Sequence, residues 1–206
     1  MNKIPDFITH YYLKDKGPFR NMMDLDDSEF RSLIEELQER RKNDRDYNRR
    51  FANAEKTRRL RENTERVLRE KFVLKGGHIK RHTPHYFCLG ESKWFKHFCG
   101  HEEIRVPLSA IDPSVISFTY PDSVTSMGFL KDLGINHPVF PYRGQVFTLG
   151  ELESIVQEYG MPQDEIPQDY NAYHRDDLEI YIEAQVWSDE PLRPFEARQV
   201  PTADTR

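Results

Sequence analysis

The chain has 206 residues, of which 37% are hydrophobic and 32% are charged, and its formal net charge is −5. This length suits one domain, or one domain with an appendage. The 13 Phe, 10 Tyr and 2 Trp can supply much of a buried core. No apolar run approaches the roughly 18 residues needed to span a bilayer. The first residues lack the features of a secretory signal, and two cysteines give no disulfide framework. We therefore expect a soluble, cytoplasmic protein.

The first predicted element is a helix that starts at a capping box. Asp26 can cap the helix and Glu29 follows three residues later. Four apolar residues then recur at helical spacing, namely Phe30, Leu33, Ile34 and Leu37. We predict helix from here to about Phe72, with residues 43–47 as the place for a break. Two glycines, Gly76 and Gly77, should end it.

Residues 40–71 of this helical region are basic, with 13 Lys and Arg against 6 Asp and Glu. Such a block could contact RNA through its phosphates. The acidic residues interrupt it, however, and Glu62–Arg66 and Glu65–Arg69 have the spacing of helix-supporting ion pairs. A solvated helix face is the favoured interpretation, and RNA contact is the alternative.

The pattern changes after the glycines to short, β-branched and aromatic segments that predict strands. These segments are Tyr86–Leu89, Ile104–Leu108, Val115–Tyr120, Gln145–Phe147 and Leu178–Trp187. A second capping box, Thr148 with Glu151, predicts a helix over Leu149–Tyr159. The fold class expected is α+β, with a helical, Arg-rich arm before a mixed or antiparallel sheet. We expect a helical region at 1–77, a sheet domain at 78–192 and a poorly ordered tail at 193–206.

Seven of the ten His and Cys residues fall between positions 78 and 101. They are His78, His82, His85, Cys88, His97, Cys99 and His101. Imidazoles and thiolates are zinc ligands, so a zinc-stabilised structural domain is one alternative. The spacing matches no closed finger pattern, and no metal site is predicted.

Glu183 stands inside the apolar segment that precedes Trp187. In a strand it shares a face with Tyr181 and Gln185, whereas Ile182 and Ala184 point the other way. A buried carboxylate is costly unless it has a partner or lines a cleft. The two interpretations are an edge strand with a polar face and a strand that lines a functional cleft.

Four segments in a fixed order resemble a family of uncharacterised bacterial domains with the ADP-ribosyltransferase-like fold. The matching residues are Pro84, Tyr86 and Leu89; Phe118, Thr119, Asp122 and Ser123; Tyr181, Ile182, Glu183, Ala184 and Gln185; and Pro191 with Leu192. The resemblance covers roughly residues 80–192 and leaves out the Arg-rich front. Trp187 stands where the family pattern has a His.

The resemblance implies that NAD is a substrate, held in a cleft between two small sheets, and that ADP-ribose passes to a protein or nucleic-acid acceptor. Glu183 matches the glutamate that stabilises the positive charge formed as nicotinamide leaves. The implied binding residues are Arg81, His85, Tyr86, Ser117, Thr119 and Gln185. An early Arg or His usually holds the ribose or diphosphate, and His10, Arg81, His82 and His85 all remain candidates for that role. A non-catalytic module that binds nucleotide or RNA is the alternative function.

Overall fold

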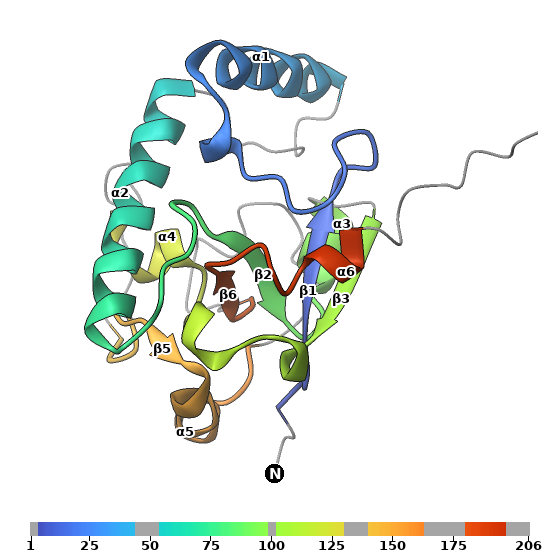
Figure 1. Cartoon of the computed structure of the whole chain (residues 1–206). Coiled ribbons are helices and arrows are strands. Elements are labelled where there is room, and N and C mark those ends of the chain that lie inside the picture. The colour runs from blue at the N-terminus through green and yellow to red at the C-terminus, as the bar shows by residue number, and fades with distance from the viewer. Residues whose placement is uncertain (1–3, 44–53, 99–101, 130–139, 163–179, 197–206) are drawn as a thin grey trace, which may run out of the picture.

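The computed structural model describes residues 4–43, 54–98, 102–129, 140–162 and 180–196, and its core is one six-stranded sheet (Figure 1). All five strand pairings are antiparallel, and the strand order is β3-β1-β2-β6-β4-β5. The strands are β1 (Phe7–Tyr12), β2 (His85–Leu89), β3 (Glu102–Pro107), β4 (Ile116–Thr119), β5 (Phe147–Thr148) and β6 (Glu183–Val186). The α+β class predicted from the sequence is confirmed.

Helices lie around this sheet. The α-helices are α1 (Asp27–Asn43), α2 (Ala54–Leu74), α3 (Lys93–Phe98), α4 (Ser123–Ser126), α5 (Leu149–Tyr159) and α6 (Arg193–Glu196). The 3-10 turns in the described part of the chain are η1 (Met22–Asp24), η3 (Leu108–Ala110) and η4 (Pro113–Val115). In Figure 1, α1 and α2 run in different directions, and α1 ends at Asn43, within the range 43–47 predicted for a break in the helical region. None of the helices in the described parts of the chain is both long and apolar enough to cross a bilayer.

Local sequence signals explain where these helices begin and end. Asp26 accepts from the backbone N–H groups of Ser28 and Glu29, and the Glu29 carboxylate accepts from the Asp26 N–H at 3.0 Å. This capping box is confirmed, as is the one between Thr148 and Glu151 that starts α5.

The glycine stop after α2 is also confirmed. Gly76 has a φ of 85°, a conformation that favours glycine. Gly77 lies so close to Phe72 that an added Cβ would stand 2.5 Å from its ring, so only glycine fits between the chain and α2.

The two faces of the sheet differ in chemistry because strand side chains alternate. One face carries the main apolar core, including Ile8, Phe87 and Phe118, and packs against Leu152 and Val156 of α5. The other face combines polar side chains with two smaller apolar clusters. In one of these clusters, Leu68 and Phe72 of α2 pack on Trp187. In the other, Trp94 of α3 packs with Cys88 and Tyr181.

Several sequence-based expectations differ from the structure. The strand β1 was not predicted, because residues 1–77 were expected to be helical. It lies inside the sheet, between β3 and β2. The sheet therefore extends beyond residues 78–192. All six strands form one sheet rather than two small ones. Residues 193–196 of the expected tail form α6, and residues 197–206 lie outside the described residues.

Candidate functional site

Glu183 lies in the interior of the sheet and not on an edge strand. Its strand, β6, is hydrogen-bonded to β2 on one side and to β4 on the other, and Glu183 is opposite Cys88 and Thr119. The residue is only 5% exposed. Its Oε1 accepts hydrogen bonds from the Ser123 backbone N–H at 3.3 Å and from the Gln185 amide at 3.0 Å. The edge-strand interpretation is therefore wrong.

Three of the predicted binding residues form a buried polar network beside Glu183. The Gln185 amide donates to Oγ1 of Thr119 at 3.0 Å, and the Ser117 hydroxyl donates to Oε1 of Gln185 at 2.9 Å. Trp187 adds its indole N–H, which donates to Oγ of Ser117 at 2.9 Å. Since all these groups are buried and paired, they set the orientation of Glu183.

A cavity of about 180 Å³ adjoins this network, and Glu183 is part of its wall. Its lining combines two arginines, several aromatic rings and one carboxylate. The lining residues are Thr9, His10, Tyr11, Arg20, Asn21, Met22, Arg61, Tyr86, Phe87, Cys88, Phe95, Tyr181 and Glu183. The structure thus brings Glu183 and Tyr86 to one cavity, with Ser117, Thr119 and Gln185 close behind Glu183.

Arg61 of α2 is the main positive charge acting on Glu183. Burial raises the pKa of Glu183 above its ordinary value of 4.5, and the Arg61 guanidinium is the largest influence that lowers it. The guanidinium carbon of Arg61 also lies 5.0 Å from the centroid of the Tyr86 ring. Burial and Arg61 therefore act on Glu183 in opposite directions, and on balance its pKa is raised.

A second buried carboxylate, Glu65, lies one turn beyond Arg61 on α2. Its Oε1 accepts from the Tyr86 hydroxyl at 2.9 Å and from the Asn21 amide at 3.3 Å. Burial raises the pKa of Glu65. The expected helix-supporting pairs are wrong, since Arg66 bonds Glu70 and Arg69 donates to the backbone carbonyl of His82.

Sequence reasoning missed Arg61 and Glu65 as site residues. Both occur at helical spacing with Leu68 and Phe72, the buried residues of α2. Because these four residues lie on one side of α2, the helical spacing could have predicted that Arg61 and Glu65 face the protein interior.

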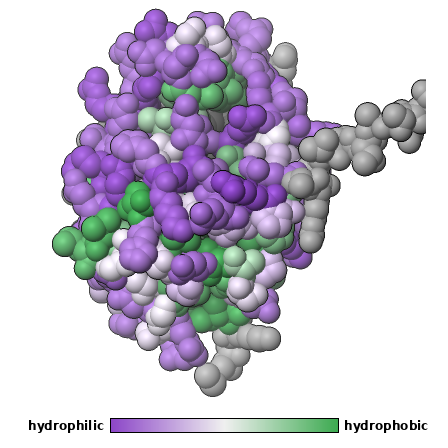
Figure 2. Space-filling model, in the orientation of Figure 1, coloured by the Kyte–Doolittle hydropathy of each residue, from purple (hydrophilic) through white to green (hydrophobic). Residues whose placement is uncertain are grey.

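A larger cavity of about 560 Å³ lies beside the first, and residues of α1 form part of its wall. The two share five lining residues, which are His10, Tyr11, Arg20, Asn21 and Met22. Leu13, Leu25, Leu33 and Leu37 line part of the larger cavity. Figure 2 shows a hydrophobic area just below the position of α1, bordered by hydrophilic side chains. Arg20 lines both cavities, is exposed, and has no hydrogen bond or ion pair with any other described residue.

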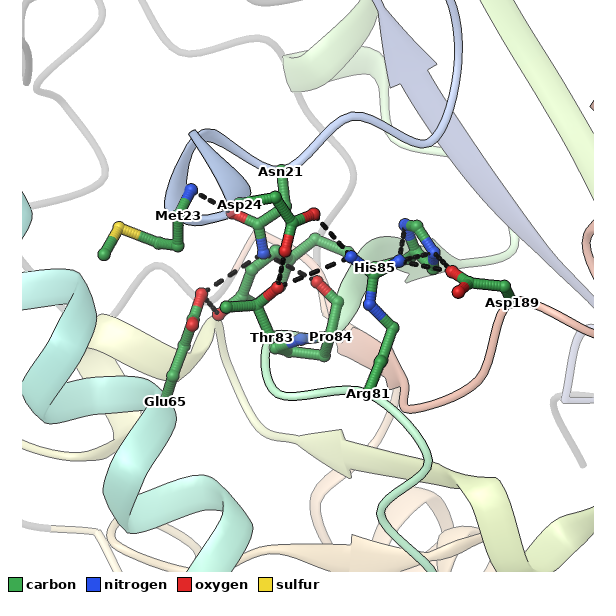
Figure 3. A network of polar contacts seen from close by, with 10 residues as sticks. Asn21, Met23, Asp24, Glu65, Arg81, Thr83, Pro84, His85 and Asp189 are labelled. Carbon is green, nitrogen blue, oxygen red and sulfur yellow. Dashed lines mark hydrogen bonds and ion pairs between the residues drawn. The ribbon is translucent and has the colours of Figure 1, made fainter. Parts of the chain in front are cut away.

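Arg81 and His85, the other two predicted binding residues, are not part of either cavity wall. His85 shares its strand face with Phe87, opposite to Tyr86. Figure 3 shows the Arg81 guanidinium between Asp24 on one side and His85 with Asp189 on the other. These contacts occupy Arg81 and His85 within the protein.

His10 lines both cavities, but both of its ring nitrogens are occupied. Nε2 accepts from the Phe19 backbone N–H at 2.9 Å, so Nδ1 carries the proton that is donated to the Tyr86 carbonyl at 2.8 Å. Burial lowers the pKa of His10 to about 4. A neutral imidazole with two backbone partners is a structural group and not a ligand for a diphosphate.

The cluster of His and Cys residues does not assemble a metal site within the described ranges. No group of three or more His, Cys, Asp or Glu side chains there has the arrangement of a metal centre. Cys99 and His101 lie outside the described residues.

Comparisons of the chain with protein-family models, with curated proteins and with solved structures give no match.

Proposed function

We propose that this protein is an ADP-ribosyltransferase-like enzyme that holds NAD across the two adjacent cavities and uses Glu183 in the transfer. The observation that carries the proposal is the position of Glu183. A carboxylate at the centre of a sheet is costly to bury, yet this one lines a cavity with two arginines and several aromatic rings. A buried carboxylate in a concave site is a strong candidate for function.

The volumes of the two adjacent cavities suit a dinucleotide that extends across both. The Glu183 cavity alone is smaller than the roughly 300–1,000 Å³ typical of small-molecule sites, whereas the cavity beside α1 lies within that range. A ligand with two ring systems joined by a diphosphate could place one ring system in each cavity. Arg20, which lines both cavities, would then face the diphosphate, which guanidinium groups bind in a bidentate manner.

The chemistry assigned to Glu183 is electrostatic. The glycosidic bond between nicotinamide and ribose breaks, its electron pair leaves with nicotinamide, and positive charge develops on the ribose. An ionised Glu183 close to that carbon stabilises the charge without accepting a proton. The acceptor then forms a bond to the same carbon and loses its own proton. The acceptor in this proposal is a protein or a nucleic acid.

The test is nicotinamide release from NAD, with labelled ADP-ribose followed onto candidate acceptors. Wild type is compared with Glu183→Gln, which keeps the shape and removes the charge. Glu190→Gln is the matched control, because Glu190 is an exposed carboxylate soon after β6 that pairs with Lys80. We expect loss of at least about 100-fold in Glu183→Gln and little change in the control. Equal rates in all three proteins would reject the proposal.

The alternative is a module that binds nucleotide or RNA without catalysis. Binding of NAD with no nicotinamide release would favour it. RNA contact through residues 40–71 would show as affinity that falls steeply with salt. In the structure, Arg40 bonds Asp15 and Glu36, and Arg58 bonds Asp27, so part of this basic block already has acidic partners.

A further inference from the structure

Arg81 is the centre of the polar network drawn in Figure 3, and its side chain is only 13% exposed. One guanidinium nitrogen, Nη2, pairs with Asp24 in η1. The other, Nη1, donates to Asp189 after β6 at 2.6 Å. Nη1 also lies against the ring of His85, whose Nε2 is 2.7 Å from the same Asp189 oxygen. The residue thus joins the turn η1 to the chain segment that leaves β6.

The turn η1 matters because it follows the wall that the two cavities share. Arg20, Asn21 and Met22 line both of them. His10 and Tyr11 of the shared wall belong to β1, whereas Arg20 and Asn21 lie outside the strands and α-helices, so the position of this part of the wall depends on side-chain attachments. The Asn21 amide provides one attachment, since it donates to the Pro84 carbonyl at 2.8 Å and to Glu65 of α2 at 3.3 Å. Asp24 provides another, since it binds both Arg81 and the Thr83 hydroxyl.

We propose that Arg81 is a positioning residue: it holds the segment Arg20–Asp24 in place and does not contact the ligand. Arg81 is well suited to this role because a guanidinium can serve two carboxylates from opposite sides at once, whereas a lysine ammonium is a single point charge. The two aspartates are partly exposed, with side-chain exposures of 42% and 61%. Arg81 is the buried member, so removing it releases both ends together. The effect on NAD rests on the proposed function, whereas the effect on the segment does not.

Hydrogen exchange of the full chain tests the structural part directly. Three backbone N–H groups report on the turn: Met23, which donates to the Asn21 side chain, and Asp24 and Leu25, which donate to backbone carbonyls. In Arg81→Met, exchange of a peptide covering residues 20–25 should rise about tenfold, while peptides of β2 and β6 keep their protection. Arg81→Lys should give an intermediate rate. Arg66→Met is the matched control, because Arg66 is an exposed arginine paired with Glu70.

Kinetics test the link to the ligand. Arg81→Met should raise KM for NAD about tenfold and leave kcat within about twofold, because Glu183 and its partners are untouched. Arg81→Lys should recover part of the loss in KM. A fall in kcat with unchanged KM would place Arg81 in the chemistry instead and overturn the proposal.

Unchanged exchange at residues 20–25 in Arg81→Met would also overturn it. If exchange rises in all peptides of Arg81→Met, the same exchange experiment is carried out on Asp24→Asn. This change weakens the contact between Arg81 and Asp24 at its exposed end. A local rise at residues 20–25 then supports the proposal, and no rise rejects it. If wild type neither binds nor cleaves NAD, the proposed function fails, but the exchange experiment still decides the role of Arg81.

Discussion

The side-chain amide of Gln185 donates to Glu183 at 3.0 Å and to Thr119 at the same distance, so one amide group connects the candidate catalytic carboxylate to the neighbouring strand. Both of its protons are used, and its oxygen accepts from Ser117. Glu183 is therefore held by a neighbour two residues along its own strand. Its orientation depends on side chains that lie behind the cavity and not on the cavity lining alone.

Replacing Gln185 should therefore weaken activity without touching the ligand. In Gln185→Leu the donor to Glu183 is lost, and the pKa of Glu183 rises further, since the Gln185 hydrogen bond lowers it. We expect nicotinamide release at neutral pH to fall about tenfold. Gln157→Leu, on the exposed surface of α5, is the control. The same rate in Gln185→Leu and in the control would show that this hydrogen bond has no part in the reaction.

Arg61 should set the acidic limit of the activity. The proposed mechanism needs ionised Glu183, whose pKa is raised by burial and lowered by Arg61. Activity should fall as pH drops through the pKa of Glu183, which lies above 4.5. In Arg61→Gln the fall should begin at a higher pH, because the neutral acid is favoured when the guanidinium is absent. The pH profile of kcat/KM measures this. Arg66→Gln should keep the wild-type profile, and identical profiles for all three proteins would contradict the assignment.

Glu183 should lower the stability of the folded protein at neutral pH. Because its folded pKa is raised above its unfolded value, the native state favours the protonated form, and ionisation above pH 4.5 costs stability. Glu183→Gln should therefore raise the free energy of unfolding at pH 7 by about 1 kcal/mol. The gain should disappear as pH falls to 4.5 and below. Urea unfolding at pH 7 and pH 4.5 provides the comparison, and a variant that is less stable at pH 7 would contradict this account.

His10 should make the protein sensitive to acid. Burial holds the pKa of His10 at about 4, compared with 6.5 for an ordinary histidine. Its contribution to stability is complete above pH 6.5 and is lost as pH falls toward 4, because only the unfolded state takes up the proton. Between pH 7 and pH 5 this amounts to about 2 kcal/mol. Urea unfolding of wild type and of His10→Gln at pH 7 and pH 5 measures this. The free energy of unfolding should fall between these pH values by about 2 kcal/mol less in His10→Gln than in wild type. An equal loss in both proteins would mean that His10 is not buried in its neutral form.

The sequence predicted the elements whose ends have local chemical signals. The capping boxes at Asp26 and Thr148 marked the starts of α1 and α5, and Gly76 marked the end of α2, because capping involves residues close in sequence. The strand β1 was missed because every one of its side chains is buried or half-buried, so it lacks a clear alternation of polar and apolar residues.

The candidate site was predicted only in part, for a physical reason. Glu183 and Gln185 were identified from the pattern of their own strand, where alternation decides which residues share a face. Which arginine acts on Glu183 depends on how α2 packs across the sheet. Arg81 is close to the matching segments in sequence but is bound by two aspartates, whereas Arg61 comes from a helix outside the resemblance and reaches the cavity. No local sequence pattern distinguishes an arginine that is paired within the protein, such as Arg81, from one that reaches the cavity, such as Arg61.

Calorimetric titration with NAD is the most direct test of the claim that the two adjacent cavities bind this ligand. Wild type should bind NAD, and Glu183→Gln should bind it with similar affinity, because the carboxylate acts on charge that forms only during the reaction. Arg20→Gln should bind about tenfold more weakly, because it removes a guanidinium that lines both cavities. No heat of binding with wild type, or the same affinity in wild type and Arg20→Gln, would contradict the account.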